Sequence, residues 1–314
     1  MKKILVLGAT SYIASFYIKE ICRENKVIGL SMDDKKMSFD TDEKELTLIS
    51  NFDYSTISIK GILEQYKPDQ IINFIGVKNA PNIIKDQFDF FYQANCGITA
   101  RLFEAIHEIA DYHPKIMLMG SASEYGVSKP AGFYSEDSPC LPDSFYGLTK
   151  IMQTKVGLFY SRNFNDKIYI FRPSTVLGPN APTGLFFSDI VTKLKKGESK
   201  ISVYNLSSTR DYVGIDDLIT AIVKISSSEC KGGIYNISSG KGSTLAEVAG
   251  LIKNYFWERL RKKIEFIETD PLDNSKINSS ILDNSKLKES TAFMPESDLK
   301  RIIYSALEVD FDKR

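Results

Sequence analysis

The chain has 314 residues, of which 43% are hydrophobic and 25% are charged, enough for one large domain or two linked ones. Forty basic and forty acidic side chains leave no net charge, which argues against nucleic-acid binding and against an anionic membrane surface. No apolar run reaches the roughly 18 residues of a membrane span, and the four scattered cysteines and two histidines predict reduced thiols, no metal site and a cytoplasmic location.

Short apolar runs alternate with helical segments in the first half of the chain. The runs predicted to be buried strands are Ile4–Leu7, Val27–Leu30, Thr47–Ile49, Gln70–Ile75, Lys115–Met119 and Lys167–Phe171. Helices are predicted over about residues 14–24, at Thr56–Tyr66, in a long region ending near Asp111, and from Tyr146 onward. This alternation predicts an α/β fold with a parallel, doubly wound sheet.

The alternation loosens after Pro173. Predicted strands follow at Ile201–Tyr204, Arg210–Val213, Gly233–Ile237 and Ile264–Ile267. Predicted helices are Phe187–Lys195, Asp216–Ser226, a segment after Thr244, and Asp298–Leu307. Thr244 and Glu247 have the spacing of a capping box, with Thr244 as N-cap. The second half therefore predicts a smaller α/β lobe.

Small and polar residues follow the predicted strands of the first half. They are Gly8, Ser31, Gly76, Ser121 and Arg172. Ligands of doubly wound sheets lie beyond the carboxyl ends of the strands, so these residues are predicted to share a site.

Tyr146 and Lys150 are spaced to lie on one face of a helix, about one turn apart. A phenol is too weak an acid to act as a base at neutral pH, and a nearby ammonium group lowers its pKa. The hypothesis is that Tyr146 is a general acid/base, Lys150 its activator, and Ser121 the group that orients the substrate. A second pair, Tyr125 and Lys129, is predicted to be a decoy because a proline follows Lys129.

These motifs, in this order, resemble the extended short-chain dehydrogenase/reductase family, which comprises NAD(P)-dependent nucleotide-sugar epimerases, dehydratases and reductases. The resemblance covers nearly the whole chain. The matching stretches are Gly8–Ala14, similar to the Gly-x-x-Gly-x-x-Gly loop, Asn73–Lys78, Asn95–Thr99, Ser121–Gly126, Tyr146–Lys150, Arg172–Pro173 with Gly178–Pro179, Arg210–Val213, Tyr235–Ile237 with Gly240, and Leu282–Lys286.

The resemblance implies a Rossmann domain for NAD(P), at 1–173 plus about 211–237, and a substrate-binding lobe, at about 174–210 plus 238–314. The substrate implied is a nucleotide-diphosphate sugar, bound by Ser121, Thr175 and Arg210. A homodimer is implied through the helix that ends near Asp111 and the helix that starts at Tyr146. The cofactor-binding residues implied are Gly8, Thr10, Ser11, Tyr12, Ile13, Ser31, Asp53, Ile75, Gly76, Lys78, Asn95, Tyr146 and Lys150.

The cofactor motifs depart from the family pattern. Ser11 and Ala14 replace two of the three loop glycines. Ser31 replaces the acid that usually holds the ribose 2′-hydroxyl of NAD, and Lys35 or Lys36 would attract a 2′-phosphate. Asp33 is an alternative, displaced acid. The cofactor is therefore NADP or NAD, and the sequence slightly favours NADP.

The residues after Ser121 reduce the number of reactions that the resemblance leaves open. Family dehydratases carry acids at positions that Ala122 and Ser123 occupy here, and Glu124 is expected to point elsewhere. A 4,6-dehydratase is therefore disfavoured, whereas an epimerase and a 4-ketoreductase both stay open. The alternative is a non-catalytic NAD(P)-binding scaffold or redox sensor on the same fold, suggested by the altered glycine loop.

Overall fold

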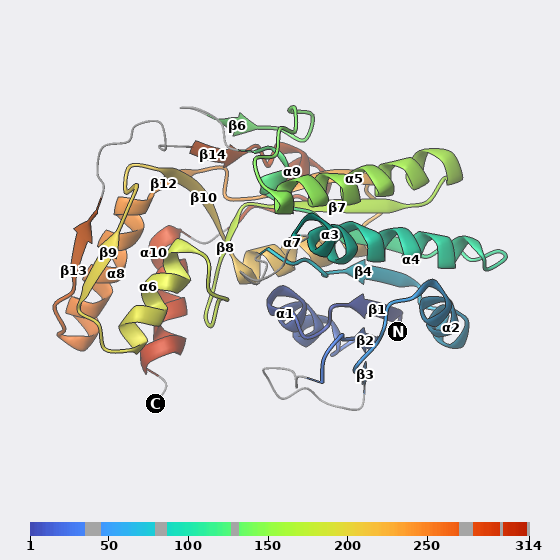
Figure 1. The fold of residues 1–314 in the computed structure, drawn as a ribbon, viewed down its shortest axis with the longest axis horizontal. Coiled ribbons are helices and arrows are strands. Elements are labelled where there is room, and N and C mark those ends of the chain that lie inside the picture. Colours follow the sequence, from blue (N-terminus) through green and yellow to red (C-terminus); the bar gives the residue numbers. More distant parts are fainter. Residues whose placement is uncertain (35–44, 79–86, 127–131, 270–278, 296–297, 313–314) are drawn as a thin grey trace. The chain divides into compact units, whose positions relative to one another are not determined.

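The computed structural model describes residues 1–34, 45–78, 87–126, 132–269, 279–295 and 298–312 (Figure 1). The chain divides into two compact units. The first comprises Met1–Gly126, Pro139–Arg172 and Ile219–Tyr235, and the second comprises Val127–Ser138, Pro173–Leu218 and Asn236–Arg314. Each unit is therefore built from segments that are far apart in the sequence.

Seven strands form the sheet of the first unit, in the order β11-β7-β5-β4-β1-β2-β3. Their bounds are β1 Lys3–Leu7, β2 Lys26–Leu30, β3 Leu46–Ile49, β4 Gln70–Asn73, β5 Lys115–Met119, β7 Ile168–Pro173 and β11 Gly233–Ile237. All neighbouring pairs from β7 to β3 are parallel, which confirms the predicted doubly wound sheet. The strand order reverses between β1 and β4, and this switch point is where such sheets bind ligands.

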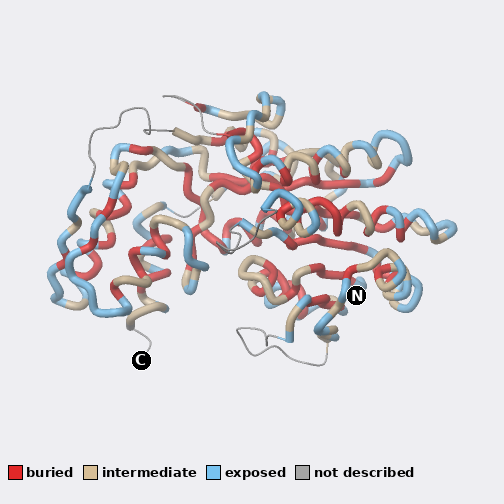
Figure 2. Tube along the Cα trace, in the orientation of Figure 1, coloured by how far each residue is buried: buried red, intermediate tan, exposed pale blue. Residues whose placement is uncertain are grey.

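Helices cover both faces of this sheet, and their bounds are α1 Tyr12–Ile21, α2 Thr56–Tyr66, α3 Gln87–Tyr92, α4 Ile98–His107, α5 Phe145–Phe164 and α7 Ile215–Ser227. Helices α2, α4 and α5 pack in a row over the strand face that carries Leu5, Ile71 and Leu118. Tyr17 of α1 lies on the opposite face, with its ring 5.3 Å from that of Phe74. The strands between the two helix layers are almost continuously buried (Figure 2). This explains why they read as unbroken apolar runs.

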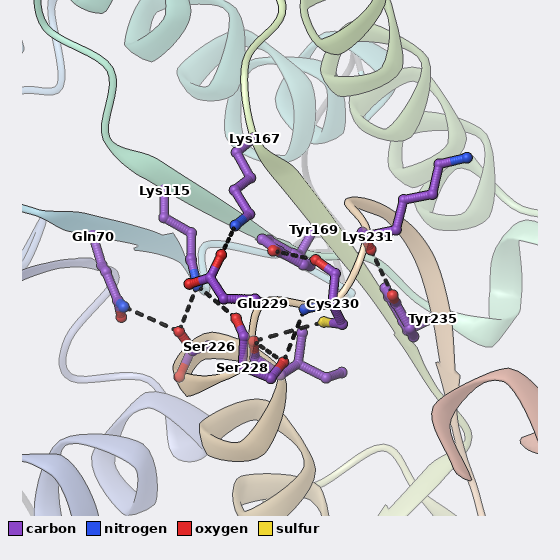
Figure 3. A network of polar contacts seen from close by, with 11 residues as sticks. Gln70, Lys115, Lys167, Tyr169, Ser226, Ser228, Glu229, Cys230, Lys231 and Tyr235 are labelled. Atoms are coloured by element: carbon purple, nitrogen blue, oxygen red, sulfur yellow. Dashed lines mark hydrogen bonds and ion pairs between the residues drawn. The ribbon is translucent and has the colours of Figure 1, made fainter. Parts of the chain in front are cut away.

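A polar network holds the amino-terminal edge of the sheet to the end of α7 (Figure 3). The Lys115 ammonium, at the start of β5, donates to the carbonyl oxygens of Ser226 at 2.8 Å and Ser228 at 3.1 Å. Gln70, at the start of β4, donates to the same Ser226 oxygen at 3.1 Å. These donors satisfy carbonyl groups that a helix leaves unpaired at its carboxyl end. The network fixes the chain that leads from α7 into β11.

Two small sheets and four helices make up the described part of the second unit. One sheet has the order β12-β10-β14-β6 with β8 added to β10, and the other pairs β13 with β9. The bounds are β6 Phe133–Tyr134, β8 Thr175–Leu177, α6 Phe186–Lys195, β9 Lys200–Val203, β10 Thr209–Gly214, β12 Gly242–Thr244, α8 Leu245–Leu260, β13 Glu265–Glu268, β14 Ser279–Leu282, α9 Ser285–Thr291 and α10 Leu299–Leu307. The capping box is confirmed, because Thr244 Oγ1 accepts from the Glu247 N–H at 3.1 Å and Glu247 accepts from the Thr244 N–H at 2.8 Å.

The structure differs from the sequence prediction mainly in short elements. Strands β6, β8, β12 and β14 and helix α9 were not predicted, because segments of two to seven residues carry too little periodicity. Strand β4 stops at Asn73 instead of Ile75, because the Asn73 side chain accepts from the Ile75 N–H at 2.9 Å. Along the described ranges, no helix combines the length and apolar character needed to cross a bilayer.

Candidate active site

The loop between β1 and α1 is shaped by Gly8. Its φ of +72° is a left-handed conformation, and a Cβ atom there would lie 2.9 Å from the Ile75 side chain. The Gly8 N–H donates to the Tyr54 hydroxyl at 3.2 Å, and that hydroxyl donates to the Leu30 carbonyl at 2.7 Å. Tyr54 thus ties the ends of β1 and β2 together. Sequence reasoning missed this residue, because nothing in its local pattern marks it.

Ser11 is the N-cap residue of α1, but its side chain does not cap the helix. Its hydroxyl oxygen is buried and has no hydrogen-bond partner among the described residues. Tyr12 and Ile13 follow as the first residues of the helix, where N–H groups lack acceptors within the helix. A hydroxyl group and helix N–H groups at one point fit the oxygen atoms of a pyrophosphate.

An acidic side chain stands at the end of β2, two residues beyond Ser31. Asp33 accepts hydrogen bonds from the Ser31 hydroxyl at 2.8 Å and the Thr10 hydroxyl at 3.2 Å. The two hydroxyl groups also lie 2.9 Å apart. The displaced acid is therefore held beside the loop that begins at Gly8. Lys35 and Lys36, on which the preference for NADP depends, lie outside the described residues.

Asp53 is exposed and has a local structural role. Its carboxylate accepts from the Ser55 N–H at 3.0 Å, and this bond lowers its pKa. Ser55 is in turn the N-cap of α2. The implied role of Asp53 in cofactor binding remains a prediction.

The chain beyond β4 meets helices α3 to α5 at Asn95. The Asn95 amide accepts from the Val77 N–H at 2.7 Å and donates to the Val77 carbonyl at 3.1 Å and to Thr149 at 2.9 Å. Asn95 lies in a π-helical turn, Gln93–Gly97, of the kind often found at functional sites. A Cβ atom on Gly76 would lie only 3.0 Å from the Lys150 ammonium nitrogen. The structure thus brings Gly76, Asn95 and Lys150 together, while Lys78 is exposed.

Tyr146 and Ser121 come together from α5 and the end of β5. Ser144 caps α5 by accepting from the Gly147 N–H at 3.2 Å, which places Tyr146 in the first turn. Burial raises the pKa of the Tyr146 phenol, a hydrogen bond to Ser121 lowers it, and the charge of Glu124 raises it further. Ser121 Oγ accepts from the Ser123 N–H at 3.1 Å. Its own proton is therefore available for donation.

Lys150 is 1% exposed and is directed into the sheet. Its ammonium group donates to the carbonyl oxygens of Ile75 at 3.1 Å and Met119 at 2.8 Å, and to the Gln153 amide oxygen at 3.0 Å. Burial lowers the pKa of Lys150 to about 8. The expected lowering of the Tyr146 pKa by Lys150 is not found in this geometry, in which burial, Ser121 and Glu124 shift the pKa of the phenol. Activation by Lys150 stays a prediction.

Gln153 was not predicted as a site residue. Its amide nitrogen donates to Thr99 at 3.0 Å, which also accepts from Asn73 at 2.9 Å. The available signal was the helical periodicity, which places Gln153 on the same face as Lys150.

The Glu124 side chain is directed into the interior of the first unit. It is fully buried and pairs with Arg172 at 2.8 Å. Arg172 is 2% exposed and lies 4.6 Å from the centre of the Tyr125 ring. Arg172 lies near the carboxyl end of β7, as predicted, but its charge is used in the pair with Glu124, and its place in a shared ligand site stays a prediction. Lys129, the partner of Tyr125 in the decoy pair, lies outside the described residues.

The predicted substrate residues Arg210 and Thr175 lie in the second unit, on neighbouring strands. β10 and β8 are parallel, with Tyr212 opposite Thr175. Arg210 donates to the Thr209 carbonyl at 2.9 Å. The adjacent Asp211 is buried and accepts from the Ser239 N–H, the Ser239 hydroxyl and the N–H groups of Gly240 and Leu282. Asp211 therefore stabilises this unit internally.

The chain is similar to known proteins over most of its length. Residues 4–238 match the model of the NAD dependent epimerase/dehydratase family. The chain is 23% identical to UDP-glucose 4-epimerase of Lactobacillus helveticus, over 78% of this chain and 79% of that protein. It is 27% identical to dTDP-4-dehydro-6-deoxyglucose reductase of Escherichia coli, over 93% and 92%. The crystal structure of UDP-glucuronic acid 4-epimerase from Bacillus cereus, with UDP-glucuronic acid and NAD, matches with a TM-score of 0.83 at 19% identity, covering 99% of this chain and 100% of that one.

Proposed function

The chain belongs to the NAD dependent epimerase/dehydratase family, and from this premise we propose that it transfers a hydride reversibly at C4 of a nucleotide-diphosphate hexose. The observation that carries the proposal is the placement of the Tyr146 phenol beside Ser121, with the Lys150 ammonium one helical turn away at the ends of β4 and β5. C4 is the carbon named in the epimerase and reductase relatives. The enzyme is an NAD(P)-dependent oxidoreductase or isomerase.

The residues at the switch point of the sheet fit a nicotinamide dinucleotide. Gly8 leaves space at the loop, and the Ser11 hydroxyl with the first N–H groups of α1 fits the pyrophosphate. When bound, the nicotinamide group supplies or accepts the hydride. The residues proposed to hold the dinucleotide are Gly8, Thr10, Ser11, Tyr12, Ile13, Ser31, Asp53, Ile75, Gly76, Lys78 and Asn95.

Tyr146 moves the proton in this proposal. It accepts the proton of the C4 hydroxyl as that carbon becomes a carbonyl, and returns the proton when the carbonyl is reduced. Ser121 donates its hydroxyl proton to the same sugar oxygen, because its own oxygen already accepts from the Ser123 N–H. Lys150 stabilises the phenolate through its positive charge. Ala122 and Ser123 offer no acid for elimination of water, which argues against a dehydratase.

The second unit is proposed to bind the nucleotide-diphosphate part of the sugar. Arg210 suits a diphosphate, because a guanidinium group forms paired hydrogen bonds with phosphate oxygens. Thr175, on the neighbouring strand, is proposed to contact the same phosphates.

Asp33 supports NAD over NADP, in contrast to the slight preference drawn from the sequence. A carboxylate fixed by Ser31 and Thr10 can accept the ribose 2′-hydroxyl of NAD and repels the 2′-phosphate of NADP. We expect the dissociation constant of NAD to be at least about tenfold lower, and Asp33→Ser to remove most of this difference, as measured by fluorescence titration. Tighter binding of NADP by the unmodified protein would contradict the assignment.

Substitution of Tyr146 tests the reaction. The assay follows nicotinamide absorbance and the NMR spectrum of the product with UDP-, GDP- and dTDP-hexoses and their 4-keto-6-deoxy forms. Tyr146→Phe is expected to lower kcat by at least about a hundredfold, the usual contribution of a general acid/base, while cofactor binding is retained. Tyr160→Phe, on the same helix, is the control. Near-normal turnover by Tyr146→Phe would rule out the mechanism.

The same assay separates the two reactions and the non-catalytic alternative. Stoichiometric oxidation of added NADH or NADPH on a 4-keto sugar identifies a reductase. Inversion at C4 without net consumption of cofactor identifies an epimerase. Binding of a sugar nucleotide without turnover of any substrate would instead favour the scaffold.

A further inference from the structure

Glu124 is a fully buried carboxylate that contacts Ser121 directly but does not reach the substrate side of the site. We propose that Glu124 is a positioning residue for the reaction, which holds Ser121 in its catalytic orientation through the backbone and is itself held by Arg172 and Thr154. This inference rests on the proposed function, because it assigns Ser121 a role in hydride transfer.

The contact with Ser121 is a reciprocal capping box. Glu124 Oε1 accepts from the Ser121 N–H at 2.9 Å, and Ser121 Oγ accepts from the Ser123 N–H at 3.1 Å. Together these bonds fix the backbone of Ser121 and one acceptor direction of its hydroxyl oxygen. The Ser121 O–H bond can then point only in the remaining directions, which include the side where Tyr146 lies and where the sugar oxygen is proposed to bind. Glu124 therefore fixes the backbone from which the serine hydroxyl is presented.

The other carboxylate oxygen of Glu124 is fixed from two sides. Oε2 accepts from the Arg172 guanidinium at 2.8 and 2.9 Å and from the Thr154 hydroxyl at 2.8 Å. Gly120 permits this approach, because a Cβ atom there would lie 2.5 Å from Glu124 Oε1 and 2.9 Å from the Phe171 carbonyl oxygen. A buried carboxylate held by several hydrogen bonds restrains its neighbour, and catalytic groups must be held within about 0.5 Å of their productive geometry.

The charge of Glu124 also acts on both reacting groups. Burial raises the pKa of Glu124 overall, and the adjacent Arg172 opposes this shift because its charge stabilises the ionised carboxylate. The negative charge of that carboxylate acts to raise the pKa of Tyr146, and it opposes the lowering of the Lys150 pKa by burial. The titratable or charged groups facing the carboxylate are Arg172 on β7, Tyr125 and Cys140 near the Arg172 guanidinium, and Tyr146 and Lys150 on α5.

Glu124→Gln and Thr154→Val test the proposal. Glu124→Gln removes the charge and keeps the shape, so we expect kcat to fall by about tenfold or more, with KM and the cofactor dissociation constant within about twofold. The limb of the pH profile that reports the Tyr146 base is expected to move to lower pH. Thr154→Val leaves the charge and the contact with Ser121 in place, so kcat should fall by a smaller factor with no shift of the pH profile.

Asp166→Asn is the matched control. Asp166 is also a buried carboxylate, paired with His107 at 2.9 Å, but it precedes β7 at the opposite edge of the sheet. If Glu124→Gln folds and its kcat and pH profile match those of Asp166→Asn, the proposal is overturned. If Glu124→Gln does not fold, an unchanged kcat of Thr154→Val overturns it. The role of Glu124 can fail while the proposed function stands: turnover by the unmodified protein that is lost in Tyr146→Phe would still support hydride transfer. If the unmodified protein shows no turnover, the proposed function and the role of Glu124 are both overturned.

Discussion

At the scale of single residues, Lys150 is a buried ammonium group whose hydrogen-bond acceptors are all uncharged. Its three hydrogen bonds go to the oxygens of Ile75, Met119 and Gln153, all of them uncharged. Burial of the ammonium group lowers its pKa to about 8, below the value of about 10.4 expected in an unfolded chain. At neutral pH the folded protein therefore carries an unfavourable buried charge.

The pH dependence of stability follows from this shift. Between about pH 8 and pH 10.4 the unfolded chain holds a proton on Lys150 that the folded protein has lost, so raising the pH stabilises the folded state. The free energy of unfolding should rise relative to that of Lys150→Met across this window, by up to about 3 kcal/mol. Urea denaturation of both proteins at pH 7 and pH 10 measures the difference. A difference that does not change with pH would show that Lys150 is not buried as described.

The spacing of Tyr146 and Lys150 predicts a shared helix face, but not what the lysine contacts. Its acceptors, Ile75 and Met119, follow or end two other strands, and only the sheet pairing brings them to α5. Similarly, the sequence predicts that Glu124 points away from the site, but not that Arg172 neutralises it. Residue types and helical periodicity are local properties, whereas burial and partners depend on the fold.

At the scale of elements, the amino-terminal edge of the sheet contains two lysines with different surroundings. Lys115 donates to two main-chain carbonyl oxygens at the carboxyl end of α7 and is partly buried, which lowers its pKa. Lys167 pairs at 2.7 Å with Glu229, and both side chains are exposed (Figure 3). The first contact satisfies partly buried groups, whereas the second lies in solvent and competes with water.

Substitution of each lysine measures how much its contact contributes to the free energy of unfolding. Lys115→Met leaves the Ser228 carbonyl without this donor and should lower the free energy of unfolding by about 1–3 kcal/mol. Lys167→Met should change it by less than about 1 kcal/mol, because an exposed ion pair contributes little. Chemical denaturation of the two variants under the same conditions provides the measurement. Equal effects would mean that the network does not hold α7 to the sheet.

The boundaries of helices and strands could be predicted where the apolar pattern ended clearly or where a capping motif marked the start of a helix. The bounds of α2, β5 and β11 agree with the prediction, and the capping box at Thr244 begins α8 as expected. The π-helical turn Gln93–Gly97 has no signature in the apolar pattern and was read as ordinary helix. Its consequence, the placement of Asn95, could be predicted only from the resemblance.

At the scale of the whole molecule, the parallel sheet was the most predictable part. Most of its strands are buried apolar runs, and helices α1, α2 and α3 directly follow β1, β3 and β4. Alternation of this kind in the sequence predicts a parallel sheet covered by helices. The second unit pairs strands that are distant in the sequence, such as β6 at Phe133–Tyr134 with β14 at Ser279–Leu282. Pairing of this kind leaves no local signal. The proposed substrate residues were therefore located only through the family resemblance.

Helix α5 carries exposed apolar side chains along one face. Phe145, Leu148 and Phe159 are 46%, 38% and 56% exposed, and their spacing places them on the same side of the helix. Stripes of this kind on soluble proteins mark interaction sites. Because the family resemblance implies pairing through the corresponding helices, a second copy of the chain is the partner predicted to cover this face.

The predicted homodimer should have twice the 35.4 kDa mass of the chain when measured by light scattering. Phe159→Glu places a charge in the contact and should yield a folded monomer, since desolvating an unpaired carboxylate is unfavourable. Ile57→Glu is the matched control, because Ile57 is 85% exposed on α2, away from the α5 stripe, and should leave the dimer intact. A monomer at all concentrations in the unmodified protein would refute the pairing. If both variants dissociated the dimer, the contact would have to be sought elsewhere than along α5.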